Sequence, residues 1–269
     1  MNDYSLSEQE LHDLQVLHRE LSEKRQADRV KAIVLLGTGW DPSQVAVALL
    51  HRLGYVYKKP KKVPGKADAQ AQKEFLSRYK KLKEQQSEQD VILFMDAVHP
   101  QHNPVMACGW IKRGKEFQVK SNTGRQRLNS NGAVNVETMS MIMRYDDTIN
   151  AQSTIQLFDQ IARCYPKARK VTVICDNARY YRPKLVQAYL ESSKIALLFL
   201  PAYAPNVNLI ERYWKYFKKI ILYNRYYETF KEFKQACEYF FANIEPHLPA
   251  LRTLLAENFQ IIEGKMGFS

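Results

Sequence analysis

Two aspartates in this sequence are placed where a metal ion could be held. Asp96 follows the unbroken apolar run Val91–Met95, and Asp176 follows the similar run Val171–Cys175. Such runs are typical of strands buried on both faces, and ligands of open α/β sheets bind at the carboxyl ends of the strands. Taken singly, each aspartate is equally well explained as a turn residue or a helix N-cap. Together, on two strands that could lie side by side, they indicate a metal site.

A third carboxylate, Glu211, comes from a segment that reads LPAYAPNVNLIERYWKYFKK. Pro201 and Pro205 interrupt regular structure there and predict an extended, bent loop. A helix is expected to follow, with Glu211 in its first turn and Trp214 on its buried side; its other aromatic side chains are Tyr213, Tyr216 and Phe217. Two asparagines, a residue type whose side chains cap helix starts, lie between the prolines and that helix: Asn206 and Asn208.

These three acids match the requirements of phosphodiester chemistry. That chemistry uses two divalent ions about 3.5–4 Å apart, one activating the attacking oxygen and one stabilising the leaving oxygen. Mg²⁺ prefers oxygen ligands and keeps several waters, so a few carboxylates suffice. We therefore interpret Asp96, Asp176 and Glu211 as candidate metal ligands, with 34 residues between the second and the third.

The composition points to a polyanionic partner. The 269 residues carry a net charge of +12 and the pI is near 9.4, which favours nucleic acid over a membrane because no strongly basic amphipathic helix with a clean apolar face stands out. The four cysteines show no close pairing, the N-terminus does not resemble a signal peptide, and no apolar run approaches the roughly 20 residues of a membrane span. We expect a reduced, cytoplasmic and nucleoid-associated protein.

Most of the excess charge lies in one segment. Residues 58–83 contain ten Lys or Arg and two acids, a net charge of +8. The first part of the segment has two prolines and a glycine and should be extended, which suits contact with a phosphate backbone; the alternative is a merely solvated surface. The second part predicts a charged helix with Phe75, Tyr79 and Leu82 on one face. The lysines expected to contact phosphate are Lys58, Lys59, Lys61, Lys62 and Lys66.

The N-terminal residues predict short helices. Ser7 and Glu10 form a capping-box pattern, a second helical run ends at Gly37, and Asp41 followed by Pro42 marks a third helix start. Short helices joined by a glycine-rich turn suit a helix-turn-helix DNA-binding unit, although a small helical bundle with no special role fits equally well.

The remaining elements predict the fold class. Their order, antiparallel strands followed by alternating helices and strands, is that of a ribonuclease-H-like α/β catalytic domain, with a small helix-turn-helix-like region before it and helices after it. The expected strands are 91–95, 105–111, 117–119, 133–136, 139–144, 171–175 and 195–200, and helices are expected at 153–164 and 182–192. We divide the chain into a partial DNA-binding region (1–57), a basic linker and helix (58–87), the catalytic domain (88–225) and C-terminal helices (226–269).

The motifs around these acids resemble a known family. MDAVHP around Asp96, GWIKRG at residues 109–114, CDNAR at Asp176, and the proline-asparagine segment ending in Glu211 with Trp214 three residues on are similar to those of mariner-like DDE transposases. The spacing of the last two acids matches the bacterial insertion-sequence branch. The resemblance covers roughly residues 88–225.

The resemblance implies a Mg²⁺-dependent endonuclease and strand transferase that uses two ions, with Mn²⁺ able to substitute. Such an enzyme binds terminal inverted repeats on double-stranded DNA, cuts there, and joins the ends to a TA target, as a homodimer. It implies that Asp96, Asp176 and Glu211 are catalytic, that Asn177 orients its neighbour, and that Asn208 pins the loop. Lys215, Lys218 and Lys219 are expected to meet phosphate, and His99 is left outside the catalytic set.

The N-terminus departs from the family, whose members carry two helix-turn-helix units before the first acid. We hypothesise an internal deletion that joined the two units across Leu50 and His51. An alternative function is therefore a catalytically idle, truncated copy that modulates a full-length transposase by binding DNA. A nuclease of the same fold with a host function is a third interpretation.

Overall fold

The computed structural model describes residues 6–57, 64–122 and 126–262. The chain divides into two compact units, Met1–Lys62 and Val63–Ser269. The second unit holds all three candidate carboxylates and the whole of the sheet.

Three helices form the described part of the N-terminal unit: α1 (Glu8–Glu20), α2 (Lys24–Gly37) and α3 (Pro42–Arg52). The predicted capping box at the start of α1 is confirmed, since the side chains of Ser7 and Glu10 each bond the other's backbone N–H. Asp41 caps α3 in the same reciprocal way with Gln44. These caps fix the helix starts that the sequence predicted.

The helices of this unit enclose a small core. Among their residues, the buried hydrophobic side chains are Ala27, Val34 and Val45. Many larger apolar side chains are exposed, Trp40 and Val47 among them.

The second unit is built on a five-stranded mixed sheet. Its order is β3-β2-β1-β4-β5; β1 pairs antiparallel with β2 and parallel with β4. The parallel pairs β1–β4 and β4–β5 place the carboxyl ends of those strands at one edge of the sheet. The strands are β1 (Asp90–Val98), β2 (Ser130–Val134), β3 (Met141–Tyr145), β4 (Lys170–Cys175) and β5 (Ile195–Phe199).

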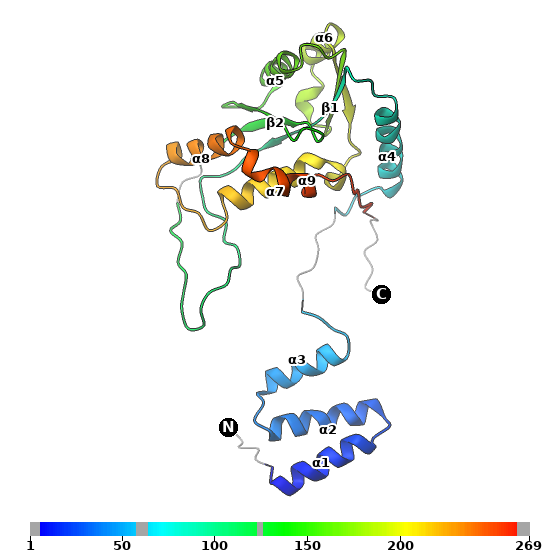
Figure 1. Cartoon of the computed structure of the whole chain (residues 1–269), viewed down its shortest axis with the longest axis vertical. Coiled ribbons are helices and arrows are strands. Elements are labelled where there is room, and N and C mark those ends of the chain that lie inside the picture. Colours follow the sequence, from blue (N-terminus) through cyan, green and yellow to red (C-terminus); the bar gives the residue numbers. More distant parts are fainter. Residues whose placement is uncertain (1–5, 58–63, 123–125, 263–269) are drawn as a thin grey trace. The chain divides into compact units, whose positions relative to one another are not determined.

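Helices cover both faces of the sheet (Figure 1). The helices α5 (Ala151–Cys164) and α6 (Lys184–Glu191) lie over one face, and the helices α7 (Leu209–Ile221), α8 (Phe230–Ala242) and α9 (Leu248–Leu254) over the other. Successive residues of β1 point to opposite cores: Phe94 packs with α7, while Leu93 and Met95 pack with α5. Burial on both faces explains why β1 reads as an unbroken apolar run.

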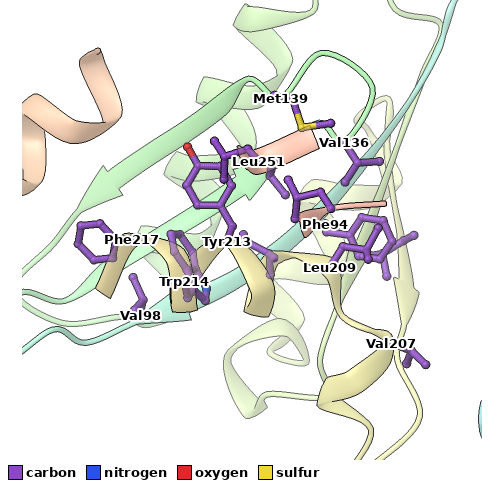
Figure 2. Packing of buried hydrophobic residues seen from close by; sticks show 14 of the residues in the cluster. Phe94, Val98, Val136, Met139, Val207, Leu209, Tyr213, Trp214, Phe217 and Leu251 are labelled. Carbon is purple, nitrogen blue, oxygen red and sulfur yellow. The ribbon is translucent and has the colours of Figure 1, made fainter. Parts of the chain in front are cut away.

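The core beneath α7 is aromatic (Figure 2). Tyr213, Trp214 and Phe217 face the sheet from α7 and pack with Phe94 of β1 and Leu251 of α9. Trp214 is 2% exposed, which confirms its expected place on the buried side of the helix.

The helix α4 (Ala69–Glu84) and the C-terminal helices belong to this same core. Phe75 and Tyr79 of α4 and Phe233 and Phe240 of α8 are buried in one cluster with α7. Phe75 and Tyr79 lie on one face of α4, as predicted. The boundaries at 87/88 and 225/226 stay predictions, while the packing joins those segments into one compact unit.

Two predicted strands are wrong. The described residues of segments 105–111 and 117–119 contain no strand, and their one ladder contact is a single bridge between Val105 and Tyr223. Trp110 is fully exposed and Phe117 is 63% exposed. This segment, part of the long connection between β1 and β2 (Figure 1), is apolar in sequence without being buried, so its composition misled the assignment.

The predicted strand pair 133–136 and 139–144 is displaced in the structure. The side chain of Asn135 accepts hydrogen bonds from the backbone N–H groups of Glu137 and Thr138, so the turn begins at Asn135. Met139 has φ of 61°, the left-handed conformation of a tight turn. The strand β2 therefore ends at Val134, two residues earlier than predicted.

None of the helices among the described residues combines the length and apolar character needed to cross a membrane.

Candidate active site

Asp96 and Asp176 lie on neighbouring parallel strands. Asp176 directly follows β4, as predicted. Asp96 lies inside β1, opposite Gly132 of β2, so the prediction that it ends its strand is wrong. The reason is that β2 pairs with β1 as far as Val98 and so extends the strand beyond the acid. Both aspartates remain at the carboxyl-end edge of the β1–β4 pair.

Glu211 reaches the same edge from the first turn of α7. The strand β5 leads into it, and the backbone N–H of Leu200 still bonds the carbonyl of Cys175 on β4. The chain then bends through Pro201 and a short 3-10 turn, Pro205–Val207, before α7 begins. The bent, proline-bounded loop predicted from the sequence is present.

The three carboxylates line one pocket of about 400 Å³. It lies between the ends of β1 and β4 and the loop that carries Glu211. The remaining lining residues come from that loop and from the residues after Asp176: Asn177, Ala178, Leu200, Pro201, Ala202, Tyr203, Ala204, Pro205 and Asn208.

The surroundings of Asp96 in the pocket disfavour its ionised form. Burial, followed by the charges of Glu211 and Asp176, raises the pKa of Asp96 to about 7. Two hydrogen bonds oppose this shift, one from the backbone of Ala97 and one from the indole of Trp214, whose Nε1 lies 3.1 Å from Oδ2 of Asp96. Burial and like charges together keep this carboxylate about half-protonated near pH 7, and a bound cation would stabilise its ionised form.

The donor set of the pocket suits a hard divalent cation. Besides the three carboxylates, Asn208 brings a buried side-chain oxygen that has no hydrogen-bond partner within the described part of the chain. Carboxylate and amide oxygens are the ligands that Mg²⁺ prefers. The chemistry of these oxygens and their mutual repulsion therefore fit the metal that the sequence predicted.

The carboxylates are not gathered around a single point. Within residues 6–57, 64–122 and 126–262, no three His, Cys, Asp or Glu side chains form a group that could hold one ion. Mg²⁺ is commonly held by one or two carboxylates together with water and substrate oxygens. Two ions could therefore bind in this pocket without any single ion contacting all three carboxylates.

The two asparagines predicted to support the site behave differently. Asn177 donates to the carbonyl of Leu200 and accepts from Arg182, while Asp176 accepts from the backbone N–H of Ala178. Asn177 therefore ties the end of β4 to the end of β5 without bonding Asp176.

Asn208 stands at the N-cap position of α7, but its side chain makes no capping bond. The loop is pinned instead by Asn206, whose amide donates to Gln72 at 2.8 Å and to the carbonyl of Gln260 at 2.7 Å. The expectation that Asn208 pins the loop is corrected accordingly: Asn208 lines the pocket, and Asn206 makes the bonds.

The predicted DNA-contacting lysines are only partly described. Lys58, Lys59, Lys61 and Lys62 lie outside the described residues. The ammonium of Lys66 lies 5.8 Å from the ring centroid of Tyr203, at the pocket wall. Lys215 and Lys219 are exposed on α7, and Lys218 is half-buried. His99 bonds Asn129 and does not line the pocket.

Sequence reasoning missed two features of the pocket. Trp214 was interpreted only as core, yet its N–H bonds Asp96; no spacing rule indicates a contact between residues 118 apart. Tyr203 lines the pocket with φ of 56°, an uncommon conformation for a side chain of its size, and is 57% exposed. An exposed aromatic between two prolines was the available signal.

The chain was compared with known proteins. Residues 91–234, more than half of the chain, match the family described as DDE superfamily endonuclease. The chain belongs to this family. Residues 41–79 match the family described as winged helix-turn helix, so the resemblance drawn from the acid motifs and the helix-turn-helix assignment are both confirmed.

This chain is similar to the insertion element IS630 uncharacterized 39 kDa protein of Shigella sonnei. The two are 22% identical over 156 residues. The match covers 58% of this chain and 46% of that relative, so less than half of the relative's length is represented.

Solved structures of Mos1 transposase have the same fold. The paired-end complex with the left transposon end has a TM-score of 0.59 at 17% identity, over 93% of this chain and 80% of that chain. The mariner Mos1 paired end complex with Mg has a TM-score of 0.58 at 17% identity, over 96% and 80%. The predicted ribonuclease-H-like class, with helical regions on both sides of it in the sequence, is confirmed.

Proposed function

We propose that this protein is the transposase of an insertion sequence. It cuts double-stranded DNA at the terminal inverted repeats of its element and joins the freed 3′-hydroxyls to a TA target. Asp96, Asp176 and Glu211 are its catalytic residues and hold two Mg²⁺ ions, for which Mn²⁺ substitutes. The observation that carries the proposal is that these three acids of a DDE-family chain line one pocket.

The proposed metal and DNA substrate are supported by the residues of this chain and by related structures. Burial, followed by the charges of Glu211 and Asp176, raises the pKa of Asp96, and one related structure contains Mg and another Mn. Bound divalent cations supply an activated oxygen nucleophile and neutralise charge on the phosphate. The DNA partner is supported by the net charge of +12, by the helix-turn-helix match, and by the transposon end in a related structure.

The residues of the pocket divide the work. The charges of Glu211 and Asp176 both act on Asp96, and the indole of Trp214 orients it by donating a hydrogen bond to its Oδ2. Asp176 is oriented by the N–H of Ala178. Glu211 is delivered by a loop whose prolines limit its freedom. We assign phosphate contact to Lys66, which lies beside Tyr203 of the pocket, to the preceding lysines Lys58, Lys59, Lys61 and Lys62, and to Lys215, Lys218 and Lys219.

The test is metal-dependent nicking of a duplex that carries the element's inverted repeat. Wild type should nick with Mg²⁺ or Mn²⁺ and lose nicking in EDTA. The isosteric variants Asp96→Asn, Asp176→Asn and Glu211→Gln should each lose at least about a hundredfold, because each removes a ligand charge. Equal nicking by wild type and Asp176→Asn would remove Asp176 from the site. A second measurement, sedimentation with and without the DNA, tests the proposed homodimer.

We further propose that the N-terminal DNA-binding region is shortened by an internal deletion across Leu50 and His51. The small core of the N-terminal unit and its exposed apolar side chains support this, because a complete unit would bury them. A gel shift against the inverted repeat tests the proposal. Weak binding that competitor DNA removes is expected, and tight, competitor-resistant binding through residues 1–60 contradicts it.

A further inference from the structure

We propose that Asn206 and Arg212 are positioning residues for Glu211, and that they act by anchoring its loop and helix to the C-terminal segment, residues 254–262, here called the C-terminal strap. The inference deepens the proposed function and rests on it for the role of Glu211. It states that the position of Glu211 depends on the C-terminal strap, which is more than 40 residues away in sequence.

The first anchor lies before Glu211. The amide nitrogen of Asn206 donates to Oε1 of Gln72 on α4 at 2.8 Å and to the carbonyl of Gln260 in the strap at 2.7 Å. Both bonds leave from a residue of the 3-10 turn that leads into α7. The approach to Glu211 is therefore attached to two separate elements.

Gln72 makes this anchor rigid. Its side chain is fully buried, with 0% exposure. Its amide nitrogen donates to the carbonyls of Asp68 and Ile262, and its Oε1 accepts from the N–H of Ile262 as well as from Asn206. A buried amide with every group bonded holds one geometry, because breaking any bond leaves a buried polar group unpaired.

The second anchor lies directly after Glu211. The guanidinium of Arg212 donates to three strap carbonyls: Leu254 at 3.2 Å, Ala256 at 2.7 Å and Asn258 at 2.8 Å. It also lies 5.9 Å from the ring centroid of Phe259. The carbonyls near Leu254 belong to the end of α9, where a helix leaves carbonyls without partners and a cation is favourable. Arg212 is thus held by the strap, while its neighbour Glu211 lines the pocket.

The strap is itself fixed to α4. Lys83 of α4 forms an ion pair with Glu257 at 2.6 Å, and the ring of Tyr79 packs edge-on against Phe259 with centroids 5.8 Å apart. Asn206 and Arg212 therefore attach Glu211, from both sides in sequence, to one supported segment. When a residue that holds a metal ligand in place without binding the metal is removed, metal affinity typically falls by about 10–100-fold.

The experiment uses the full chain with Asn206→Ala and Arg212→Gln, and measures Mn²⁺ binding by calorimetry. Matched controls are Gln152→Ala, which removes an exposed amide on α5, and Arg252→Gln, which removes an exposed arginine on α9. We expect Mn²⁺ affinity to fall about tenfold in each test variant and to stay within about twofold of wild type in the controls. Nicking should recover when Mn²⁺ is raised about tenfold, since the acids themselves are intact.

Hydrogen exchange provides a readout that needs no metal. Amides of residues 206–215 should exchange faster in both test variants, while those of β1 stay as in wild type. Wild-type Mn²⁺ affinity together with wild-type exchange in Asn206→Ala overturns the inference. If Arg212→Gln does not fold, Asn206→Ala decides alone, because it leaves the three Arg212 bonds in place.

The failure of the proposed function is separable. The proposed metal site is contradicted if the wild-type protein binds no Mn²⁺, or if Asp176→Asn binds Mn²⁺ as tightly as wild type does. The exchange measurement then still shows whether Asn206 and Arg212 hold the segment around Glu211.

Discussion

The indole Nε1 of Trp214 donates a hydrogen bond to Oδ2 of Asp96 over 3.1 Å. The bond joins β1 to α7, the two elements that carry the first and third acids of the pocket. It is made inside the aromatic core, where Trp214 is 2% exposed. A bond from a neutral donor to a charged carboxylate in such a place favours the ionised form of Asp96, against the burial and the like charges that raise its pKa.

Trp214→Phe should therefore lower activity in a pH-dependent way. Phenylalanine keeps an aromatic ring in the core but has no N–H, so the pKa of Asp96 should rise above its present value of about 7. A hydrogen bond to a charged group is worth about 1.5–3 kcal/mol, which predicts roughly a tenfold or larger loss of nicking at pH 7 that shrinks by pH 9. The measurement is the pH profile of nicking at a limiting Mg²⁺ concentration, where protonation of Asp96 competes with binding of the cation. Trp110→Phe, at a fully exposed position, is the control, and an unshifted profile in Trp214→Phe would falsify the role of the N–H.

Gly132 should be sensitive to a single added methyl group. A Cβ at Gly132 would lie 2.6 Å from Sδ of Met143 and 2.8 Å from Cη2 of Trp214. Gly132→Ala is expected to lower the free energy of unfolding by about 1–3 kcal/mol through overpacking and to displace the indole from Asp96. Urea unfolding followed by nicking at pH 7 checks both. Gly109→Ala, where no atom lies within 4 Å of the new methyl, should match wild type in both measurements.

The sequence could predict the acids because strand burial and chain order are local signals. The apolar runs before Asp96 and Asp176 indicate buried strands by themselves, and the two prolines before Glu211 likewise indicate a loop. What could not be predicted depends on tertiary contact. The bond between Asp96 and Trp214, like the anchoring of Asn206 by Gln72 across 134 residues, has no local pattern.

The wrong strands have a related cause. Residues 105–111 contain Val105, Met106, Trp110 and Ile111, and an apolar run predicts a strand only if another element covers it. The structure leaves these four side chains between 42% and 107% exposed. The extra length of β1 beyond Asp96 likewise depends on its pairing with β2, which the residues of β1 alone do not encode.

The basic segment should control the salt dependence of DNA binding. Each phosphate contact by a lysine contributes about 0.9 to the slope of log K against log salt. Replacing five lysines by glutamine should therefore reduce that slope by up to about 4.5, with little change in sequence preference. Binding is measured by fluorescence anisotropy between 50 and 200 mM salt, a range in which such contacts weaken strongly. The residues are Lys58, Lys59, Lys61, Lys62 and Lys66.

The control for that experiment changes exposed lysines that do not line the pocket: Lys167, Lys184 and Lys231. Their replacement should leave the slope within about 0.5 of wild type, since without a phosphate contact no counterion is released. Equal effects per residue in the two sets would show that net charge alone, and not this segment, drives binding.

The charge on Asp96 should make the metal-free protein less stable as pH rises. Its pKa is raised from an ordinary 3.8 to about 7 in the folded state, so between these values the folded protein binds more protons than the unfolded chain. Stability is then fully present below about pH 4 and is lost as pH rises to about 7. One pH unit corresponds to about 1.4 kcal/mol, which sets an upper limit on the order of 4 kcal/mol.

Asp96→Asn removes this titration while keeping an oxygen for the indole of Trp214. In EDTA the variant should therefore melt above wild type at pH 8, and the two should converge towards pH 4. Adding Mg²⁺ at pH 8 should stabilise wild type, by about 2.7 kcal/mol at a hundred times the dissociation constant, and should leave the variant nearly unchanged. Thermal unfolding across pH, with and without Mg²⁺, measures both effects. A variant that melts with wild type at every pH would show that neither burial nor the neighbouring carboxylates destabilise the ionised form of Asp96 in the folded protein, and the argument for a cation there would lose its electrostatic basis.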